Sequence, residues 1–233
     1  MVTAIFPAAG QGRRMELGVN KIFLELGGRP ILIHTLQAFS ACAAVDDMIV
    51  VVAPDEVPVV KALLEGVPGL KPYRVTAGGA ERQHSIANAL RLLPEETEVV
   101  LVHDGARPLV SAAVIERVAG EARESGAAAA GVPEKNTIKV VDAAGWILST
   151  PDRKALWSIQ TPQGFRRDIL TQAYARAAAD GFLGTDDASL VERIGVRVKV
   201  VMGAYSNLKI TTPEDMVVAE AFLRQAQAEG GDR

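Results

Sequence analysis

Short apolar runs alternate with stretches of helical periodicity along most of this chain. Each run has the length of one strand, and each helical stretch carries apolar residues at the spacing of one helix face. The predicted strands cover residues 2–7, 48–53, 98–103 and 127–132, and the predicted helices cover residues 31–41, 56–64, 82–93 and 112–124. Strands that are apolar on both faces lie inside a parallel sheet, with helices on either side. We therefore predict the α/β class, with a doubly wound, mostly parallel sheet.

Residues 137–149 interrupt this alternation. Two short apolar segments flank residues 142–145, a glycine-containing turn that is typical of a β-hairpin. A hairpin is antiparallel, so we expect it to project from the parallel core as an arm. An exposed arm that carries Ile138 and Trp146 would promote aggregation unless it packs on something. Folding back on its own subunit is one solution, but we favour packing on a second subunit, which predicts a homodimer.

Size and charge restrict the class of protein further. A chain of 233 residues can bury a substantial core, and we expect one domain over residues 1–233, with the arm at about residues 137–149. The net charge of −3 argues against a nucleic-acid partner held by phosphate contacts. We see no signal-peptide pattern and no apolar run near the ~18 residues that span a bilayer. We therefore expect a cytoplasmic protein with no membrane partner.

A loop rich in glycine and arginine follows the first predicted strand. Gly10 and Gly12 allow backbone N–H groups to approach a ligand closely, Arg13 and Arg14 supply planar charged groups, and Lys21 supplies a mobile charge. Open α/β sheets bind their ligands at the carboxyl ends of the strands. The loop is therefore predicted to bind phosphates; the alternative is a turn with two surface arginines.

Two well-known glycine loops do not match this segment. A dinucleotide-binding loop has a third glycine where this chain has Met15, and a further stretch separates Met15 from Lys21. A Walker A loop ends in Gly-Lys-Ser or Gly-Lys-Thr, and neither follows here. An NAD-dependent oxidoreductase is therefore disfavoured.

Two polar residues follow the predicted strand at 98–103. Asp104 is suited to hold Mg²⁺ bound to a triphosphate, because hard cations take oxygen ligands, and Arg107 is suited to hold a second anion. A surface turn with an ion pair is an equal alternative. We expect His103 to be structural, since no catalytic partner is visible for it.

Other candidate segments lie before and after this one. Gly78 and Gly79 would let a flat base lie against the backbone, and Ser85 would hydrogen-bond the edge of the base; a plain strand-to-helix loop is the alternative. Residues 149–153 and 159–165 are expected to form substrate-side loops, and residues 184–189 a turn and helix cap. Lys209 would be a third cation for phosphates or a surface lysine.

In order along the chain, these segments resemble the 2-C-methyl-D-erythritol 4-phosphate cytidylyltransferase family. The matching pieces are AAGQGRRM, Lys21, GGAERQHS, VHDGARP, the hairpin arm, QTPQGF, GTDDAS and SNLKITTPED. Each piece is unspecific alone, but the ordered set is specific and covers nearly the whole chain. The chain departs from the family at Asn20, where proline is common, and has glycine at position 105, where alanine is also seen. Neither change removes a chemical group.

The resemblance implies a Rossmann-like nucleotidyltransferase fold and a reaction of CTP with 2-C-methyl-D-erythritol 4-phosphate, a polyol phosphate. It implies that Arg14 and Lys21 are catalytic and stabilise the α-phosphate. The implied nucleotide contacts are Ala8, Ala9, Gly10, Gly12, Arg13, Gly78, Gly79, Ser85, Asp104 and Lys209. The implied contacts to the polyol phosphate are Asp104, Arg107, Arg153 and Thr185, with Arg153 crossing the dimer interface. Mg²⁺, or another divalent cation, would contact Asp104 directly or through the nucleotide phosphates.

Two alternatives to this activity stay open at this point. Ribitol-5-phosphate cytidylyltransferases share most of the motifs, and residue chemistry does not separate the two polyol phosphates. A non-catalytic nucleotide-binding protein could use the same scaffold, although the full set of cations in the phosphate loop argues against it.

Overall fold

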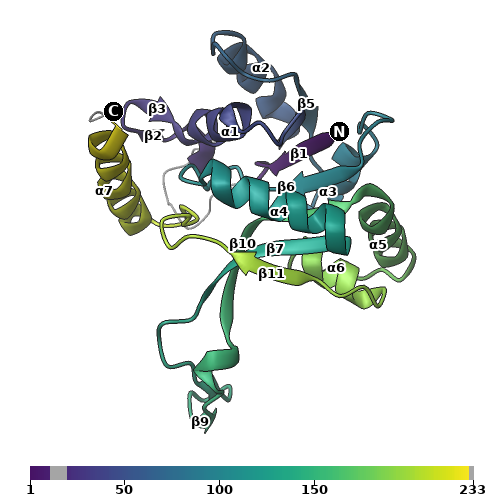
Figure 1. Cartoon of the computed structure of the whole chain (residues 1–233), viewed down its shortest axis with the longest axis vertical. Helices are drawn as coiled ribbons and strands as arrows, with labels where there is room; N and C mark the ends of the chain where they lie inside the picture. Colours follow the sequence, from purple (N-terminus) through teal and green to yellow (C-terminus); the bar gives the residue numbers. More distant parts are fainter. Residues whose placement is uncertain (11–19, 231–233) are drawn as a thin grey trace.

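The computed structural model describes residues 1–10 and 20–230, and most of the strands among them form one central sheet (Figure 1). Within these residues the sheet has seven strands, in the order β11-β7-β10-β6-β1-β4-β5. The strands are β1 (Val2–Pro7), β4 (Asp47–Val52), β5 (Tyr73–Ala77), β6 (Val99–Val102), β7 (Ala127–Pro133), β10 (Trp157–Arg166) and β11 (Lys199–Met202). β1 lies parallel between β4 and β6, β4 is parallel to β5, and β7 is parallel to β11. The predicted, mostly parallel sheet is confirmed.

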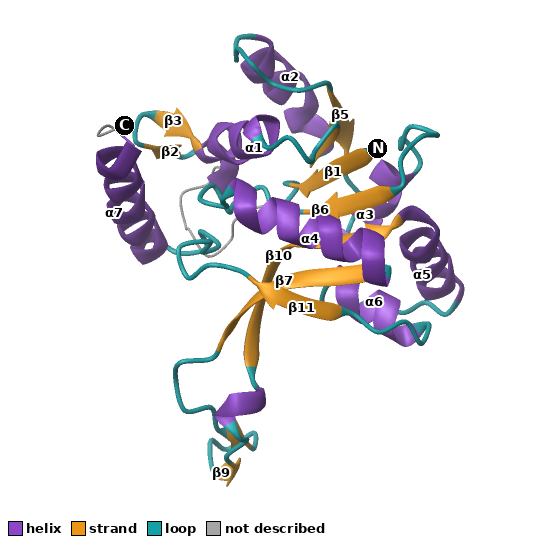
Figure 2. Ribbon diagram, viewed as in Figure 1, coloured by secondary structure: helices purple, strands orange, loops and turns teal. Residues whose placement is uncertain are grey.

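Helices cover both faces of this sheet (Figure 2). They are α1 (Ile31–Ala41), α2 (Val57–Glu65), α3 (Arg82–Leu90), α4 (Ala112–Ser125), α5 (Arg167–Ala179) and α6 (Asp187–Arg193). Successive residues of a strand point to opposite faces. Phe6 accordingly packs with α1, α2 and α4, whereas Ile5 packs with α3, α5 and α6. The double winding is therefore confirmed.

Smaller elements lie outside these layers. The last helix, α7 (Pro213–Gly230), packs on β2 (Glu25–Leu26) and β3 (Arg29–Pro30) through a cluster that includes Leu26, Ile210 and Ala219. Short 3-10 helices occur at η2 (Lys21–Phe23) and η3 (Pro54–Glu56). Of the helices described, none has the length and apolar character needed to cross a membrane.

One expectation was wrong: residues 159–165 form most of β10 and are not a loop. β10 lies in the middle of the sheet, antiparallel to β6 and β7. Proline within an apolar run argues against a central strand, because it cannot donate a ladder hydrogen bond. Here Pro162 falls where the register shifts between Ile159 and Gln163, so the ladder resumes beyond it. Phe165, past the shift, is fully buried.

The predicted hairpin projects from the body as an arm (Figure 1). It contains β8 (Val140–Val141) and β9 (Ile147–Ser149), and η4 (Arg153–Ala155) follows. Its strands are shorter than expected, since Thr137 and Ile138 precede β8. The arm does not fold back on the described part of the chain: Trp146 is 75% exposed, and Ile147 and Leu148 are also exposed.

Candidate active site

A cavity of about 690 Å³ opens at the carboxyl ends of β1, β4 and β6. The lining residues that the sequence proposed are Ala8, Ala9, Gly10, Lys21, Gly79, Ser85, Asp104 and Lys209. Parallel strands bring their carboxyl ends to one edge, which is why segments far apart in the sequence meet here. Gly12, Arg13 and Arg14 lie outside the described residues.

The second glycine loop forms one wall of this cavity. The Gly78 amide donates to the carbonyl oxygen of Val52 at 2.7 Å, which ties the loop to β4. A Cβ atom at Gly78 would lie 2.7 Å from Ser85 Oγ and 2.9 Å from the Cβ of Ala9. Glycine is therefore required by close packing between the two glycine loops.

Ser85 is buried in the first turn of α3, and its hydroxyl is already engaged. The hydroxyl donates to the carbonyl oxygen of Glu81 at 3.1 Å and accepts from the Gly79 amide at 3.0 Å. A hydroxyl has one proton and two lone pairs. With its proton used, Ser85 can offer a ligand only an acceptor.

Asp104 is the centre of a cluster of charges at the same cavity. Its Oδ2 atom lies 3.0 Å from Lys209 Nζ and 3.3 Å from Arg107 Nε, and its Oδ1 atom lies 3.7 Å from Arg82 Nε. Burial raises the pKa of the Asp104 carboxyl, but Lys209, Arg82 and Arg107 outweigh burial and hold this pKa well below its usual range. The cluster therefore has three cations around one permanent anion.

Arg82 is the member of this cluster that sequence reasoning missed. It lines the cavity and also pairs with buried Asp187, with 2.8 Å between Nη2 and Oδ2. The available signal was its position in the GGAERQHS segment, as the first residue of the helix predicted at residues 82–93.

His103 has the structural role that was expected. It is fully buried beside Phe39, with 3.1 Å from Nδ1 to Thr161 Oγ1 and 3.1 Å from Nε2 to the Arg107 carbonyl oxygen. Burial lowers the pKa of His103 to about 3. A neutral imidazole thus links the Arg107 carbonyl to the Thr161 hydroxyl, which also accepts from the Asp104 amide.

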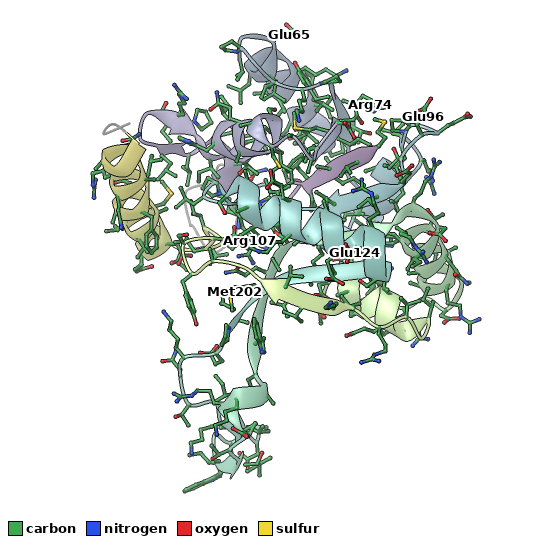
Figure 3. The ribbon with its side chains drawn as sticks, in the orientation of Figure 1. Glu65, Arg74, Glu96, Arg107, Glu124 and Met202 are labelled. Carbon is green, nitrogen blue, oxygen red and sulfur yellow. The ribbon has the colours of Figure 1, made fainter. Side chains whose placement is uncertain are left out.

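Three predicted substrate contacts lie outside the cavity lining. Arg107, labelled in Figure 3, is one of them. It pairs with Asp104 and donates to the carbonyl oxygen of Asn207 at 2.8 Å, so it ties the Lys209 segment to the cluster. Thr185 is exposed on the loop before α6. Arg153 is exposed on the arm and donates to its own Lys135 carbonyl oxygen at 2.8 Å.

The carboxylate that the charged cluster offers to a metal ion is that of Asp104. Among the described residues there is no group of three or more His, Cys, Asp or Glu side chains placed to hold a metal ion. Asp104 nevertheless lines the cavity, and among the described residues its Oδ1 atom has one ion-pair partner, at 3.7 Å. Magnesium is usually held by one or two carboxylates together with substrate phosphates, so the site fits a metal carried by a nucleotide.

A second hollow, of about 660 Å³, lies beside α5 and α6. It is lined by Arg176 and Arg193, and both pair with Asp180 at 2.9 Å. No described residue of either glycine loop lines it, so we do not consider it for the same chemistry.

Comparisons with known proteins identify the family of this chain. The family model for 2-C-methyl-D-erythritol 4-phosphate cytidylyltransferase matches residues 2–225. The protein of that name from Geotalea uraniireducens is 49% identical over 231 residues, covering 98% of this chain and 99% of the relative. The one from Caldanaerobacter subterraneus subsp. tengcongensis is 46% identical over 225 residues, covering 96% and 99%.

Solved structures give the same result. The 4-diphosphocytidyl-2C-methyl-D-erythritol synthase of Anaerococcus prevotii matches with a TM-score of 0.86 at 34% identity, covering 96% of each chain. The 2-C-methyl-D-erythritol 4-phosphate cytidylyltransferase of Thermus thermophilus matches with a TM-score of 0.79 at 36% identity, covering 96% of this chain and 98% of the other. The chain belongs to the 2-C-methyl-D-erythritol 4-phosphate cytidylyltransferase family.

Proposed function

We propose that this chain transfers the cytidylyl group of CTP to the phosphate of 2-C-methyl-D-erythritol 4-phosphate, in non-mevalonate isoprenoid synthesis. The observation that carries the proposal is the cavity in which two glycine loops face the cations around Asp104. Both reactants are anions, so the protein must neutralise charge and align the reacting groups. The cavity offers both cations and closely approaching backbone, and the chain belongs to the 2-C-methyl-D-erythritol 4-phosphate cytidylyltransferase family.

In the proposed reaction a phosphate oxygen of the acceptor attacks the α-phosphorus of CTP in line. The bond from the α-phosphorus to the oxygen that bridges the α- and β-phosphates breaks, and pyrophosphate leaves with the electron pair. Lys21 lines the cavity, and we assign it, with Arg14, to the charge that grows on the α-phosphate oxygens. Lys209 and Asp104 lie on the same cavity, where they would align the two phosphates.

We derive the choice of base from the hydrogen-bonding role that Ser85 has left, which is that of an acceptor. Cytosine has an amino donor where a uracil-type base has a carbonyl acceptor. A Ser85 hydroxyl that only accepts suits the amino group and leaves a carbonyl unpaired. We therefore propose that Ser85, with the backbone at Gly78 and Gly79, reads cytosine.

We further propose that the nucleotide enters with Mg²⁺ or another divalent cation. Asp104 would be its protein ligand, directly or through the nucleotide phosphates. The cation would supply further neutralisation of the phosphates. Asp104 itself would keep its charge, because its pKa lies well below its usual range.

Three finer parts of the proposal concern the whole molecule. The exposed apolar arm supports a homodimer, in which Arg153 serves the partner's site and Thr185 contacts the polyol phosphate. The one central sheet supports a single domain over the chain. We also propose that the reaction takes place in the cytoplasm, which would retain both charged substrates because they do not cross a bilayer unaided.

Pyrophosphate release tests this function. CTP, UTP and ATP would each be incubated with 2-C-methyl-D-erythritol 4-phosphate, ribitol 5-phosphate or no acceptor. We expect release with CTP and the methylerythritol phosphate. Faster release with ribitol 5-phosphate would move the assignment to that acceptor, and no release with any pair would favour a non-catalytic binding protein.

A Lys21 variant tests the proposed chemistry in the same assay. Lys21→Ala should lower kcat by roughly 10²–10³ with little change in CTP affinity, because the charge it meets develops in the transition state. Lys61→Ala, on the exposed face of α2, is the matched control. Near-normal turnover of Lys21→Ala would contradict the assignment.

A further inference from the structure

A line of polar side chains leads from the cavity to the buried face of α5. Tyr174, on α5, donates its hydroxyl proton to Asp187 Oδ1 at 2.5 Å. Asp187, the first residue of α6, accepts from Arg82 through its other oxygen at 2.8 Å. Arg82, the first residue of α3, reaches Asp104. Tyr174 and Asp187 are buried and do not line the cavity, whereas Arg82 and Asp104 do.

The location of Arg82 is unfavourable for helix stability. A cation in the first turn of a helix faces the positive end of the helix dipole. The Arg82 side chain is also only 32% exposed, so its charge has lost much of its water. Asp187 compensates both effects, and Tyr174 satisfies the second oxygen of Asp187. An arginine that needs this support is better explained by a task at the cavity than by stability.

Arg82 has a distinct position around Asp104. Arg107 and Lys209 both contact Oδ2, whereas Arg82 is the described cation that faces Oδ1. Both carboxylate oxygens lie off the Cβ–Cγ axis, so the contacts to Oδ2 already limit rotation about that bond. Arg82 adds a contact to Oδ1, so the carboxylate is held at both oxygens.

The loop that carries Asp187 is itself fastened to α3. The Gln83 side chain donates to the carbonyl oxygen of Phe182 at 2.9 Å and accepts from the Gly184 amide at 3.0 Å. Gln163, on β10, accepts from the Ala188 amide at 3.0 Å. Asp187 is therefore held at a constant distance from Arg82.

We propose that Arg82 is a positioning residue that orients Asp104 for the reaction, and that Tyr174 and Asp187 act on the reaction through Arg82. The proposal rests on the cytidylyl transfer described above. Arg82 directs the carboxylate plane of Asp104 toward the cavity, and the Tyr174–Asp187 pair sets the orientation of the guanidinium group. The high pKa of Tyr174, raised by burial and by Asp187, keeps its hydroxyl a donor.

A double-mutant cycle tests this line of contacts. The full-length variants Tyr174→Phe, Arg82→Met and the double variant would be compared for kcat and for KM of both substrates. Arg82→Met should lower kcat roughly 10²-fold, as a misplaced reacting group does. Tyr174→Phe should lower kcat about tenfold, with KM for CTP nearly unchanged. Mutation of a hydrogen-bond partner behind a metal ligand has an effect of this size. In the Arg82→Met background the Tyr174 change should cost under about twofold.

Two matched controls separate this role from a structural one. Tyr73→Phe removes a hydroxyl on the edge strand β5, and Arg91→Met removes an exposed charge just after α3. Both should keep wild-type kcat. The proposal is overturned if Tyr174→Phe has the same kcat as Tyr73→Phe, or if Tyr174→Phe lowers kcat by the same factor with and without Arg82. It is also overturned if the loss of kcat is fully accounted for by a lower Tm.

A crystal structure of Tyr174→Phe gives a readout that does not need the proposed reaction. The expected result is a turned Arg82 guanidinium that no longer faces Asp104 Oδ1. An unchanged Arg82–Asp104 contact would overturn the proposal even if the wild type proved inactive with CTP. Absence of wild-type pyrophosphate release would instead refute the proposed function alone.

Discussion

Asn20 donates a hydrogen bond from its side-chain amide to the Glu56 carboxylate at 3.0 Å. The same amide group donates to the carbonyl oxygen of Ala8 at 2.9 Å, and Glu56 also accepts from the Ala53 amide at 3.2 Å. Asn20 therefore joins the ends of β1 and β4 immediately before Lys21. This chain uses a hydrogen-bonded side chain at a position where its family commonly has proline.

Replacing Asn20 tests whether this junction holds Lys21 in place. Asn20→Ala should lower the free energy of unfolding by about 1–3 kcal/mol, because it leaves the buried Ala8 carbonyl unpaired. It should also lower kcat/KM severalfold. Asn20→Pro should lose less activity, since the φ of −66° at Asn20 is the value that proline fixes. Urea unfolding and steady-state kinetics measure both effects, and equal losses in the two variants would contradict a role for backbone restriction.

Gly78→Ala should damage the nucleotide side of the cavity. The added Cβ would lie 2.7 Å from Ser85 Oγ and 3.3 Å from the Val52 carbonyl oxygen, so the loop must move. We expect a loss of about 1–3 kcal/mol in stability, as for overpacking, with a higher KM for CTP. Gly66→Ala is the control, because nothing lies within 4 Å of the new Cβ and the φ of −84° is ordinary. A Gly78→Ala enzyme with wild-type KM and Tm would refute the close-packing argument.

Ser85→Ala should weaken the discrimination between CTP and UTP. The variant loses the acceptor that we assign to the amino group of cytosine, which should cost about 1–3 kcal/mol, so kcat/KM for CTP should fall roughly 5- to 150-fold. The value for UTP should change less, because no good contact is lost. Competition between the two nucleotides in one reaction measures the ratio directly. An unchanged ratio would assign base choice to the backbone alone.

The layers of the fold follow from sequence periodicity, and the exceptions have physical causes. The strand at residues 2–7 and the helix at residues 31–41 were predicted with their observed bounds, because both are continuous and end in clear signals. β10 was missed because a proline such as Pro162 argues against a central strand. The register shift that accommodates Pro162 is visible only in the structure. β5 is half-buried and lies at the sheet edge, so its apolar pattern is weak.

The site could be assembled from the sequence only in part. The positions of Lys21, Ser85 and Asp104 at one sheet edge follow from strand order. The contact between Arg82 and Asp187 does not, since 105 residues separate them and no local pattern relates the first residue of one helix to the first residue of a later one. Partners that meet only through tertiary packing carry no periodic signal.

His103 predicts a dependence of stability on pH. Its pKa is about 3 in the folded protein, against an ordinary value of 6.5, because burial opposes the charged form. A base with a depressed folded pKa binds more protons when unfolded, so its contribution is present above about pH 6.5 and is lost as pH falls toward about pH 3. Between about pH 7 and about pH 5 the loss should be about 2 kcal/mol. Denaturant unfolding of wild type and His103→Gln, with exposed His84→Gln as the control, should show a flatter slope only for His103→Gln.

The exposed arm predicts that activity requires two copies of the chain. Trp146, Ile147 and Leu148 would be covered if two arms embrace, and a two-fold dimer is the commonest arrangement. Deleting residues 140–148 should give a monomer or an aggregate with little activity. Light scattering on the purified variant measures this, and an active dimer would rule out the arm as the interface.

Mixing inactive variants tests whether Arg153 serves the partner subunit. Arg153 lies on the arm and is not in the cavity lining of its own chain, whereas Lys21 is. A heterodimer of Arg153→Ala and Lys21→Ala subunits would then contain one site with both wild-type residues, and should recover about half of wild-type activity. A heterodimer of Lys21→Ala and Asp104→Asn subunits is the matched control, because both residues line one cavity and each site would lack one of them. Equal inactivity of the two verified heterodimers would show that Arg153 acts within its own subunit, while recovery in the first alone would place the arginine of one chain in the active site of the other.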